Sequence, residues 1–341
     1  MHFHFQAHLP DGASQDLDWC ERHPLGGTET AVLRMAAALR RQGHEVTISG
    51  EPASCEVFVA VRDFRLFAQG RGPGRLNYLW CHDDVNQPFV EPLRDRALAA
   101  TVYGRCDRVI VLSHYMLERW QAELHLSLDK VFLSSNGVPL ERFRTTPETL
   151  RGRPPRAYYS STPFRGLELL LKAWPIVHDA LPQAELWIFS SMQIYRTEDS
   201  DEQRQLYEQA RTLPGVRYQG AVGQAELREA TQQCRVLAYP CVFPETSCIT
   251  AMEAMASGCA VVSTALGALP ETAWRNPLVP LGDGWINVWA LELFRLLVDE
   301  VHYLQLAEQN LAVARWLGWE TVAKRWIGRI EADLAVRGGA S

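Results

Sequence analysis

The chain has 341 residues, and its 34 Lys and Arg against 40 Asp and Glu give a net charge of −6. Domains usually contain about 100–200 residues, so this length favours two domains. The apolar content of 47% argues against a disordered chain or a fibre, and no strongly basic domain is present for nucleic-acid binding.

Eight cysteines form no C-x-x-C pair, which indicates reduced, mostly buried thiols in a cytoplasmic protein. No apolar run reaches the ~18 residues of a transmembrane helix, and the first residues do not resemble a signal peptide. We therefore expect a soluble protein, with peripheral membrane contact left open.

Strands alternate with helices along the first part of the chain. The pattern predicts strands at 2–7, 45–49, 57–61, 76–80, 108–112 and 130–134, with helices at 28–42, 92–104 and 113–124. Prolines at 147, 154 and 155 then indicate a linker at 145–156. Beyond it the pattern predicts strands at 157–161, 185–189, 216–219, 236–239 and 260–264, with helices at 167–181, 202–213, 225–233 and 249–257. This alternation predicts an α/β protein with parallel sheets in two successive units.

Two glycines, Gly26 and Gly27, directly precede the predicted helix at 28–42. Adjacent glycines let the backbone approach a ligand, and a helix N-terminus favours an anion. Taken alone, a turn followed by a helix cap is the favoured explanation of such a pair. The pattern is neither G-x-G-x-x-G nor a P-loop, so it does not support an NAD or P-loop site.

Two carboxylates lie close together in the sequence at the predicted helix 249–257. Glu245 precedes the helix and Glu253 lies about two turns inside it, so they are separated by roughly 10 Å along the axis. That span suits a nucleotide sugar whose diphosphate rests on the helix N-terminus, with one carboxylate on sugar hydroxyls and the other on a ribose. Taken alone, Glu253 is also explained as an exposed or paired residue of an apolar helix.

Several motifs occur in the order typical of the family 4 (group 1) retaining glycosyltransferases, which the chain resembles. They are Gly26-Gly27-Thr28-Glu29, Asn136-Gly137-Val138 with Phe143, Arg165-Gly166-Leu167, and Glu245-x7-Glu253 with Gly258 and Val261-Val262 downstream. The resemblance implies a GT-B fold, in which two Rossmann-like β/α/β domains face each other across a cleft. It divides the chain into an acceptor-side domain (1–150), a nucleotide-sugar domain (151–318) and a C-terminal helix (319–341) that crosses back to the first domain.

The resemblance also assigns roles to individual residues. Glu245 orients the donor sugar, His82 reaches toward the sugar and the acceptor, and Arg165 occupies the lysine position that offsets the diphosphate charge. The implied donor-binding positions are Gly26, Gly27, Ser160, Ser161, Arg165, Thr246, Ser247, Cys248, Ile249, Thr250 and Glu253, the last of which holds the ribose.

Two positions depart from the family pattern. Ser160 stands where the family often has an arginine, so one phosphate-neutralising charge is absent, and Cys248 stands where the family usually has glycine. These departures leave catalytic competence open. A catalytically weak or inactive nucleotide-binding protein is therefore one alternative, and a sugar-nucleotide epimerase or hydrolase is another.

The resemblance implies transfer of a sugar from a UDP- or GDP-sugar to an acceptor hydroxyl, with retention of anomeric configuration. The acceptor is a glycan, a glycolipid or another hydroxyl compound, as in bacterial polysaccharide or glycolipid synthesis. We expect no metal or other cofactor, and a location in the cytoplasm or at the inner face of the cell membrane.

Other patterns suggest competing sites. Asp199-Ser200-Asp201 is a D-x-D sequence, but it lies at a predicted helix start and is better explained as a cap. Asp83-Asp84 beside His82 has no further His or Cys at ligand spacing, so no metal site is expected. Ser113-His114 lacks the G-x-S-x-G context of a hydrolase.

One stretch of the first domain is basic. Its arginines are Arg62, Arg65, Arg71 and Arg75. A solvated loop is the favoured interpretation. An anionic acceptor or a membrane surface is the alternative.

Overall fold

The computed structural model describes residues 1–10, 15–51 and 54–338, and the chain divides into two compact units. The first comprises the chain up to Leu17, Gly27–Gly137 and the chain from Gly318 onward; the second comprises Asp18–Gly26 and Val138–Leu317. The last three residues of the expected C-terminal segment at 319–341 lie outside the described residues.

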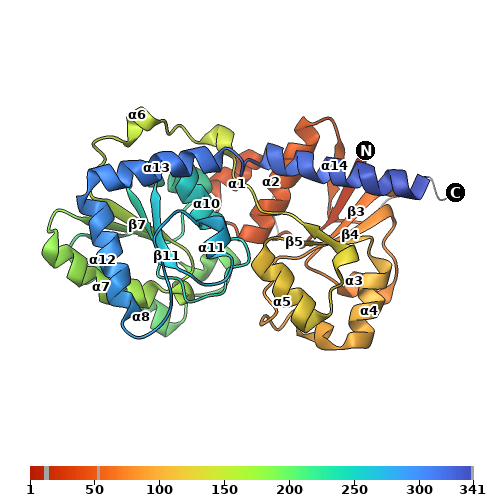
Figure 1. Cartoon of the computed structure of the whole chain (residues 1–341), viewed down its shortest axis with the longest axis horizontal. Coiled ribbons are helices and arrows are strands. Elements are labelled where there is room, and N and C mark those ends of the chain that lie inside the picture. Colours follow the sequence, from red (N-terminus) through yellow and green to blue (C-terminus); the bar gives the residue numbers. More distant parts are fainter. Residues whose placement is uncertain (11–14, 52–53, 339–341) are drawn as a thin grey trace. The chain divides into compact units, whose positions relative to one another are not determined.

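The first unit is built on a six-stranded sheet in the order β2-β1-β3-β4-β5-β6 (Figure 1). All its neighbouring strands are parallel. The strands are β1 (His2–Gln6), β2 (Glu45–Ile48), β3 (Cys55–Val61), β4 (Gly74–Trp80), β5 (Arg108–Val111) and β6 (Val131–Leu133). The helices of this unit are α2 (Gly27–Arg41), α3 (Arg65–Gln69), α4 (Arg96–Arg105), α5 (His114–Leu124) and α14 (Trp319–Gly338).

The helix expected at 92–104 is divided in two. A 3-10 turn, η1 (Glu91–Arg94), precedes α4. Asp95 separates them because its backbone is extended. Its carboxylate accepts a hydrogen bond from the Leu98 amide, so Asp95 is the N-cap of α4.

The C-terminal helix α14 packs on the first unit, as expected from the resemblance to GT-B glycosyltransferases. Its apolar residues Val322, Trp326 and Ile330 lie at helical spacing and are fully buried. Asp333 continues that face and accepts hydrogen bonds from the Tyr78 hydroxyl at 2.6 Å and from Arg108 at 2.7 and 2.9 Å.

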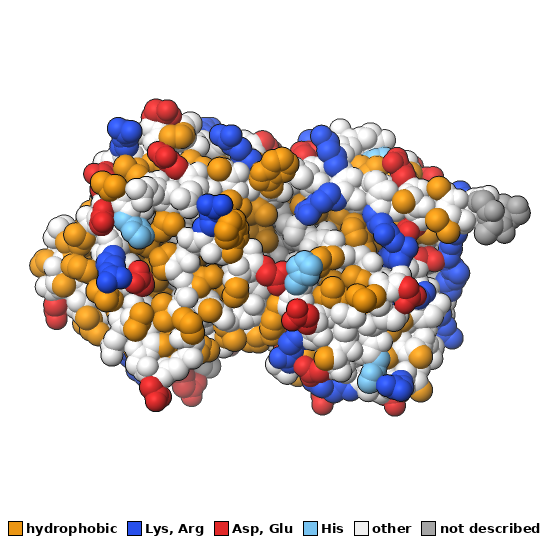
Figure 2. Space-filling view, in the orientation of Figure 1, with side chains coloured by type: hydrophobic (Ala, Val, Ile, Leu, Met, Phe, Trp, Pro, Cys, Tyr) orange, Lys and Arg blue, Asp and Glu red, His pale blue; other side chains and the backbone are white. Residues whose placement is uncertain are grey.

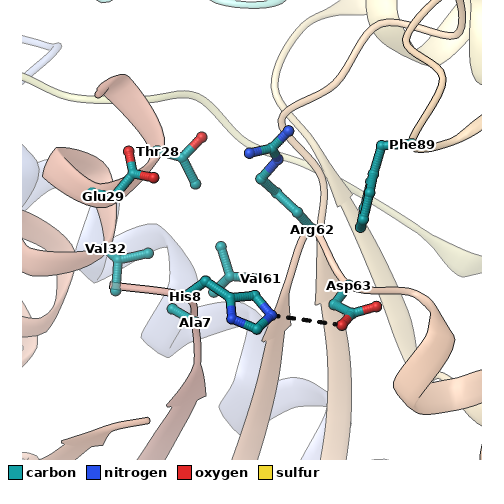
Figure 3. Close-up of a pocket in the computed structure, with 9 residues that line it drawn as sticks. All are labelled: Ala7, His8, Thr28, Glu29, Val32, Val61, Arg62, Asp63 and Phe89. Carbon is teal, nitrogen blue, oxygen red and sulfur yellow. Dashed lines mark ion pairs between the residues drawn. The ribbon is translucent and has the colours of Figure 1, made fainter. Parts of the chain in front are cut away.

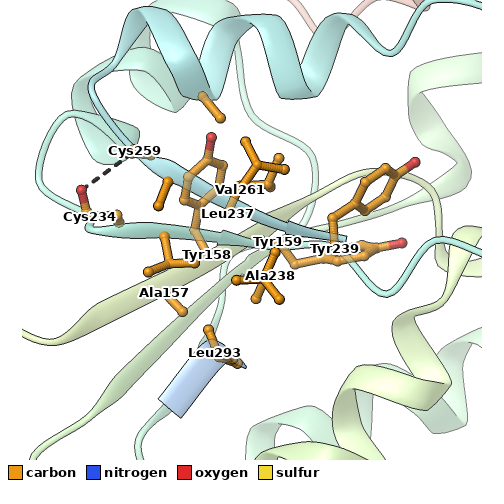
Figure 4. Close-up of a cluster of buried hydrophobic side chains, with 14 of the residues drawn as sticks. Ala157, Tyr158, Tyr159, Cys234, Leu237, Ala238, Tyr239, Cys259, Val261 and Leu293 are labelled. Atoms are coloured by element: carbon orange, nitrogen blue, oxygen red, sulfur yellow. Dashed lines mark hydrogen bonds between the residues drawn. The ribbon is translucent and has the colours of Figure 1, made fainter. Parts of the chain in front are cut away.

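The second unit repeats the architecture with the strand order β12-β11-β10-β7-β8-β9, again parallel. Its strands are β7 (Arg156–Ser160), β8 (Glu185–Phe189), β9 (Val216–Tyr218), β10 (Val236–Ala238), β11 (Ala260–Thr264) and β12 (Leu278–Val279). Its main helices are α7 (Leu167–Ala180), α8 (Asp201–Thr212), α9 (Gln224–Thr231), α10 (Ile249–Ala256), α12 (Trp285–Val298) and α13 (Glu300–Ala314), with the short α11 (Leu269–Thr272). Figure 4 shows the core at the central strands, where Tyr158, Leu237 and Val261 interdigitate.

The segment at 145–156, expected as an irregular linker, is part of the second unit. Residues 147–150 form the short helix α6 (Pro147–Leu150), and Leu150 is fully buried. The guanidinium of Arg153 donates hydrogen bonds to the carbonyls of Cys234 and Ser257 at 2.8 and 3.0 Å. Proline at the first helical position starts a helix rather than breaking one, which explains the difference.

The short helix α1 (Leu17–Arg22) lies mostly within the segment assigned to the second unit. The buried carboxylate of Glu21 pairs with Arg228 at 2.5 Å. Glu21 thus ties this segment to α9.

The structure confirms the α/β fold class, with two Rossmann-like units of parallel sheets flanked by helices. On the face drawn in Figure 2, acidic and basic side chains are scattered over both units. No helix in the described part of the chain is long and apolar enough to cross a membrane.

Candidate active site

The start of α10 is shaped by a turn with an unusual backbone. Cys248, the residue before the helix, has φ +41°, in the left-handed region that glycine adopts most readily. A non-glycine residue in such a conformation costs about 1–2 kcal/mol. Glycine, which the resemblance leads one to expect here, would adopt this conformation without that cost, whereas Cys248 adopts it under strain.

Two glycines fix the backbone around this turn. At Gly267, where φ is +63°, an added Cβ would lie 2.6 Å from the backbone N and O atoms of Glu245. At Gly166, where φ is +120°, an added Cβ would lie 2.1 Å from the carbonyl oxygen of Pro240. Both close approaches require the absence of a side chain, so they hold Glu245 and the segment after β10 in place.

Glu245 and Arg165 form an ion pair at this turn. The Arg165 Nη1 atom lies 2.6 Å from Glu245 Oε1, and only 8% of the Glu245 side chain is accessible. The Tyr239 hydroxyl donates a hydrogen bond to the same carboxylate oxygen. A buried carboxylate is thus held by one cation and one phenol, which fixes its orientation.

The pair changes the acid–base properties of its members. Burial alone would lower the pKa of Arg165, but the Glu245 carboxylate and the Tyr239 and Tyr195 phenols outweigh it and raise that pKa well above its usual value. Burial and the charge of Glu245 raise the pKa of Tyr239. Arg165 is therefore a permanent cation, and Tyr239 stays a neutral hydrogen-bond donor.

Aromatic rings surround the guanidinium. Its carbon lies 4.5 Å from the Phe243 ring centroid and 5.6 Å from that of Phe164. The buried Nε atom of Arg165 has no hydrogen-bond partner among the described residues. Cation–π contacts hold the group in place while leaving this donor unused.

The loop after β7 meets the start of α10. Thr250 donates a hydrogen bond from Oγ1 to the Ser160 carbonyl at 3.0 Å, and the Ser161 hydroxyl lies 3.3 Å from that of Tyr239. The Thr162 hydroxyl is buried without a partner in the described structure. Hydroxyl donors thus gather beside the first amide groups of α10, which lack intrahelical partners.

The remaining expected donor-binding residues lie on the same turn and helix. Thr246 and Ser247 precede Cys248, and Ile249 begins α10. Glu253 lies inside α10 and is half-buried between fully packed neighbours. The second unit therefore brings together the expected positions from Ser160 to Arg165 and from Glu245 to Thr250.

The expected residues His82 and Gly27 belong to the first unit. His82 follows β4, and its ring lies 4.7 Å from that of Trp80. Burial, with a smaller contribution from Arg62, lowers the pKa of His82 to about 3, so its imidazole is neutral at pH 7. Gly27 is the first residue of α2, while Gly26 closes the segment assigned to the second unit.

Comparison with known proteins shows which family this part of the chain resembles. A family model described as "Glycosyl transferases group 1" matches residues 157–299. The matched residues lie within the second unit and make up less than half of the chain. The match covers the Arg165, Glu245 and Glu253 motifs and confirms the resemblance drawn from the sequence.

A curated relative supports the same family. The D-inositol 3-phosphate glycosyltransferase of Corynebacterium glutamicum (strain R) is 28% identical over 163 residues, which are 47% of this chain and 39% of the relative. The chain thus aligns with well under half of that relative's length.

Solved structures show the fold of the whole chain. Sucrose-phosphate synthase from Thermosynechococcus elongatus is 17% identical with a TM-score of 0.73, covering 98% of this chain and 99% of that one. HepE of Anabaena, solved with UDP and glucose, is 14% identical with a TM-score of 0.73, covering 97% and 100%. These similarities confirm the GT-B fold class.

Sequence reasoning missed part of the candidate site. Tyr239 was expected only as the last residue of a strand, and no sequence pattern indicated a role for Phe243 or Phe164. A tyrosine hydroxyl at the buried end of a strand needs a hydrogen-bond partner, which is the signal that identifies Tyr239 as a neighbour of a polar site.

The acidic pairs bind other protein groups. Ser200 caps α8 with its side chain, as expected for the D-x-D sequence, and Asp199 accepts a hydrogen bond from the Met192 amide at 2.8 Å. Asp83 pairs with Arg62, and Asp84 accepts a hydrogen bond from Tyr115. No cluster of three or more His, Cys, Asp or Glu side chains suited to a metal occurs in the part of the chain that the structure describes.

Proposed function

We propose that this chain is a retaining glycosyltransferase that binds a UDP- or GDP-sugar on the second unit and an acceptor hydroxyl on the first. The observation that carries the proposal is the Arg165–Glu245 ion pair at the start of α10, inside the group 1 glycosyl transferase domain. A fixed carboxylate and a permanent cation at a helix N-terminus suit a sugar with its diphosphate.

Each group has a part in the proposed reaction. The acceptor oxygen forms a bond to the anomeric carbon as the bond from that carbon to the diphosphate oxygen breaks. The acceptor proton passes to the departing diphosphate. Arg165 and the amide groups at the start of α10 stabilise the charge that develops on the diphosphate, and Glu245 orients the sugar hydroxyls.

His82 has a restricted role in this proposal. Since the pKa of its buried imidazole is about 3, His82 is not a proton donor at neutral pH. It acts instead as a neutral hydrogen-bonding group for the sugar or the acceptor. The proposed reaction therefore depends on no protein acid with a pKa near 7.

Related proteins support a nucleotide-sugar donor. HepE of Anabaena has been solved with UDP-glucose and with UDP. We propose UDP-sugars as the first donors to test and GDP-sugars as the second. We also propose that transfer needs no metal, so that activity survives a chelator.

A thermal-shift screen of UDP, GDP and their sugars tests donor binding, because a ligand that binds only the folded state raises the melting temperature. The proposal predicts a shift with at least one nucleotide and its sugar, followed by nucleotide release in the presence of acceptors and EDTA. No shift with any of them would overturn it.

One observation favours a second candidate, a nucleotide-binding protein with little turnover. Arg165 is already neutralised by Glu245, and Ser160 supplies no second cation. A nucleotide-induced shift with neither transfer nor hydrolysis of any donor would select this candidate.

A further inference from the structure

The first unit contains a pocket of about 110 Å³ at the ends of β1 and β3 and the start of α2 (Figure 3). Thr28 and Glu29 from α2 lie on one side, with Arg62 and Phe89 opposite. Ala7, Val32 and Val61 supply apolar lining. The small volume of the pocket suits one small ring rather than a chain of sugars.

The arginines beside the pocket are already paired. Arg62 donates to both carboxylate oxygens of Asp83 at 2.6 and 2.8 Å, and it is the only Arg or Lys among the described lining residues. Arg65 donates to both carboxylate oxygens of Asp63 at 2.7 and 3.0 Å. Farther along the basic stretch, Arg71 lies 3.3 Å from Asp107. Three of the four arginines of the stretch are therefore paired, and the fourth, Arg75, does not line the pocket.

Glu29 sets the balance of charge in the pocket. Its carboxylate has no hydrogen bond or ion pair with any residue that the structure describes, and the side chain is half-buried. His8 is 85% exposed and lies 3.8 Å from Asp63. With Arg62 and Asp63 both paired, Glu29 is the lining carboxylate that has no ion pair with the residues that the structure describes.

These features favour one kind of occupant. A phosphate group would meet the Glu29 carboxylate without an uncommitted arginine or lysine among the described lining residues. A polyhydroxy ring would place its C–H groups on the apolar lining and Phe89. Its hydroxyls would donate to Glu29 and pair with Thr28. Carboxylates and hydroxyls are suitable partners for sugar hydroxyls.

We propose that this pocket binds the acceptor as an uncharged polyhydroxy ring, a sugar or a cyclitol without a phosphate, selected by Glu29. The proposal rests on the glycosyltransferase function proposed above. It differs from what the C. glutamicum relative's name would suggest, since that name specifies an inositol phosphate.

Saturation-transfer NMR on the full chain, without donor, tests the proposal. The probes are myo-inositol against D-myo-inositol 3-phosphate, and methyl α-D-glucopyranoside against its 6-phosphate. Within each pair only the phosphate differs. We expect the uncharged member to bind at least ~5-fold more tightly. A difference of that size requires only about 1 kcal/mol.

Variants of Glu29 sharpen the test. Glu29→Lys should reverse the preference toward the phosphorylated probes, and Glu29→Gln should weaken binding of the uncharged ones without reversing it. Glu118→Lys, which makes the same charge change at an exposed position of α5, is the control and should alter neither. If Glu29→Lys fails to fold, the effect of Glu29→Gln on the binding of the uncharged probes decides the test.

Preference of the wild-type chain for the phosphorylated probes would overturn the proposal. So would an unchanged preference in the Glu29 variants, or no saturation transfer to either uncharged probe. Titration with UDP on the same samples measures nucleotide binding by the second unit separately. Loss of UDP binding with intact ring binding would reject the glycosyltransferase function but leave the charge selectivity of the pocket established.

Discussion

Replacing Glu245 with glutamine separates the charge of this residue from its shape. The amide oxygen can still accept hydrogen bonds from Arg165 and Tyr239, but the negative charge that compensates Arg165 is lost. We therefore expect Glu245→Gln to affect both stability and turnover, because Glu245 is a structural partner of Arg165 as well as a proposed ligand of the donor sugar.

The geometry sets the expected size of both effects. Removing one partner of a fully buried ion pair costs about 3–5 kcal/mol. Here 8% of the Glu245 side chain and 20% of the Arg165 side chain are accessible, so we expect a loss of about 2–3 kcal/mol. That corresponds to a fall in melting temperature of about 4–12 °C for a unit of this size. Turnover should fall about 10²–10³-fold, as for other preorganised polar groups at a reaction centre.

Urea unfolding measures the loss of stability. Nucleotide release, with the donor that the thermal-shift screen identifies, measures the loss of turnover. Glu168→Gln is the matched control, because Glu168 pairs with Lys172 at 2.5 Å while 59% of its side chain is exposed. It should change neither quantity measurably. Glu245→Gln with turnover within threefold of wild type would refute the role given to this carboxylate.

Other predictions concern the scaffold. Asp333→Ala should destabilise the first unit by about 2–4 kcal/mol in urea unfolding at pH 7, because it leaves Arg108 and Tyr78 without their buried acceptor. Burial would raise the pKa of Asp333, but Arg108 and Tyr78 lower it overall. Its contribution is therefore complete above about pH 4 and is lost as the pH falls through the lowered value. An Asp333→Asn defect equal at pH 7 and pH 3 would contradict this. Gly166→Ala should destabilise the second unit in the same assay, since its Cβ would collide with the Pro240 carbonyl; unchanged stability would show that the turn relaxes freely. All eight cysteines are buried, so the native chain should react with a thiol reagent at pH 8 only as fast as it opens, and rapid reaction would contradict the packing.

Most of the fold follows from hydrophobic periodicity. The predicted strands of both sheets match observed strands within about two residues, because buried parallel strands are short apolar runs between turns. The elements between β11 and α14 were not predicted. Yet Trp289, Leu293 and Leu296 lie at helical spacing on α12 and are fully buried, so periodicity alone marks that helix.

The candidate site could be predicted only in part from the sequence. Motif spacing indicated Arg165 and Glu245, but not that they pair, since 80 residues separate them. Cys248 looked like a departure from the family pattern, and only the backbone angle shows that the position demands a left-handed conformation. Charge compensation of Arg62 by Asp83 was equally hidden, because these residues are 21 positions apart and pair only in the folded chain.

Isothermal titration of UDP and GDP into the wild-type chain and Arg165→Gln tests the central claim most directly. The claim predicts that at least one nucleotide binds the wild-type chain and that Arg165→Gln weakens this binding at least ~10-fold, or about 1.4 kcal/mol. Glu168→Gln should bind as the wild type does. No nucleotide binding to the wild-type chain, or equal binding to Arg165→Gln, would contradict the account.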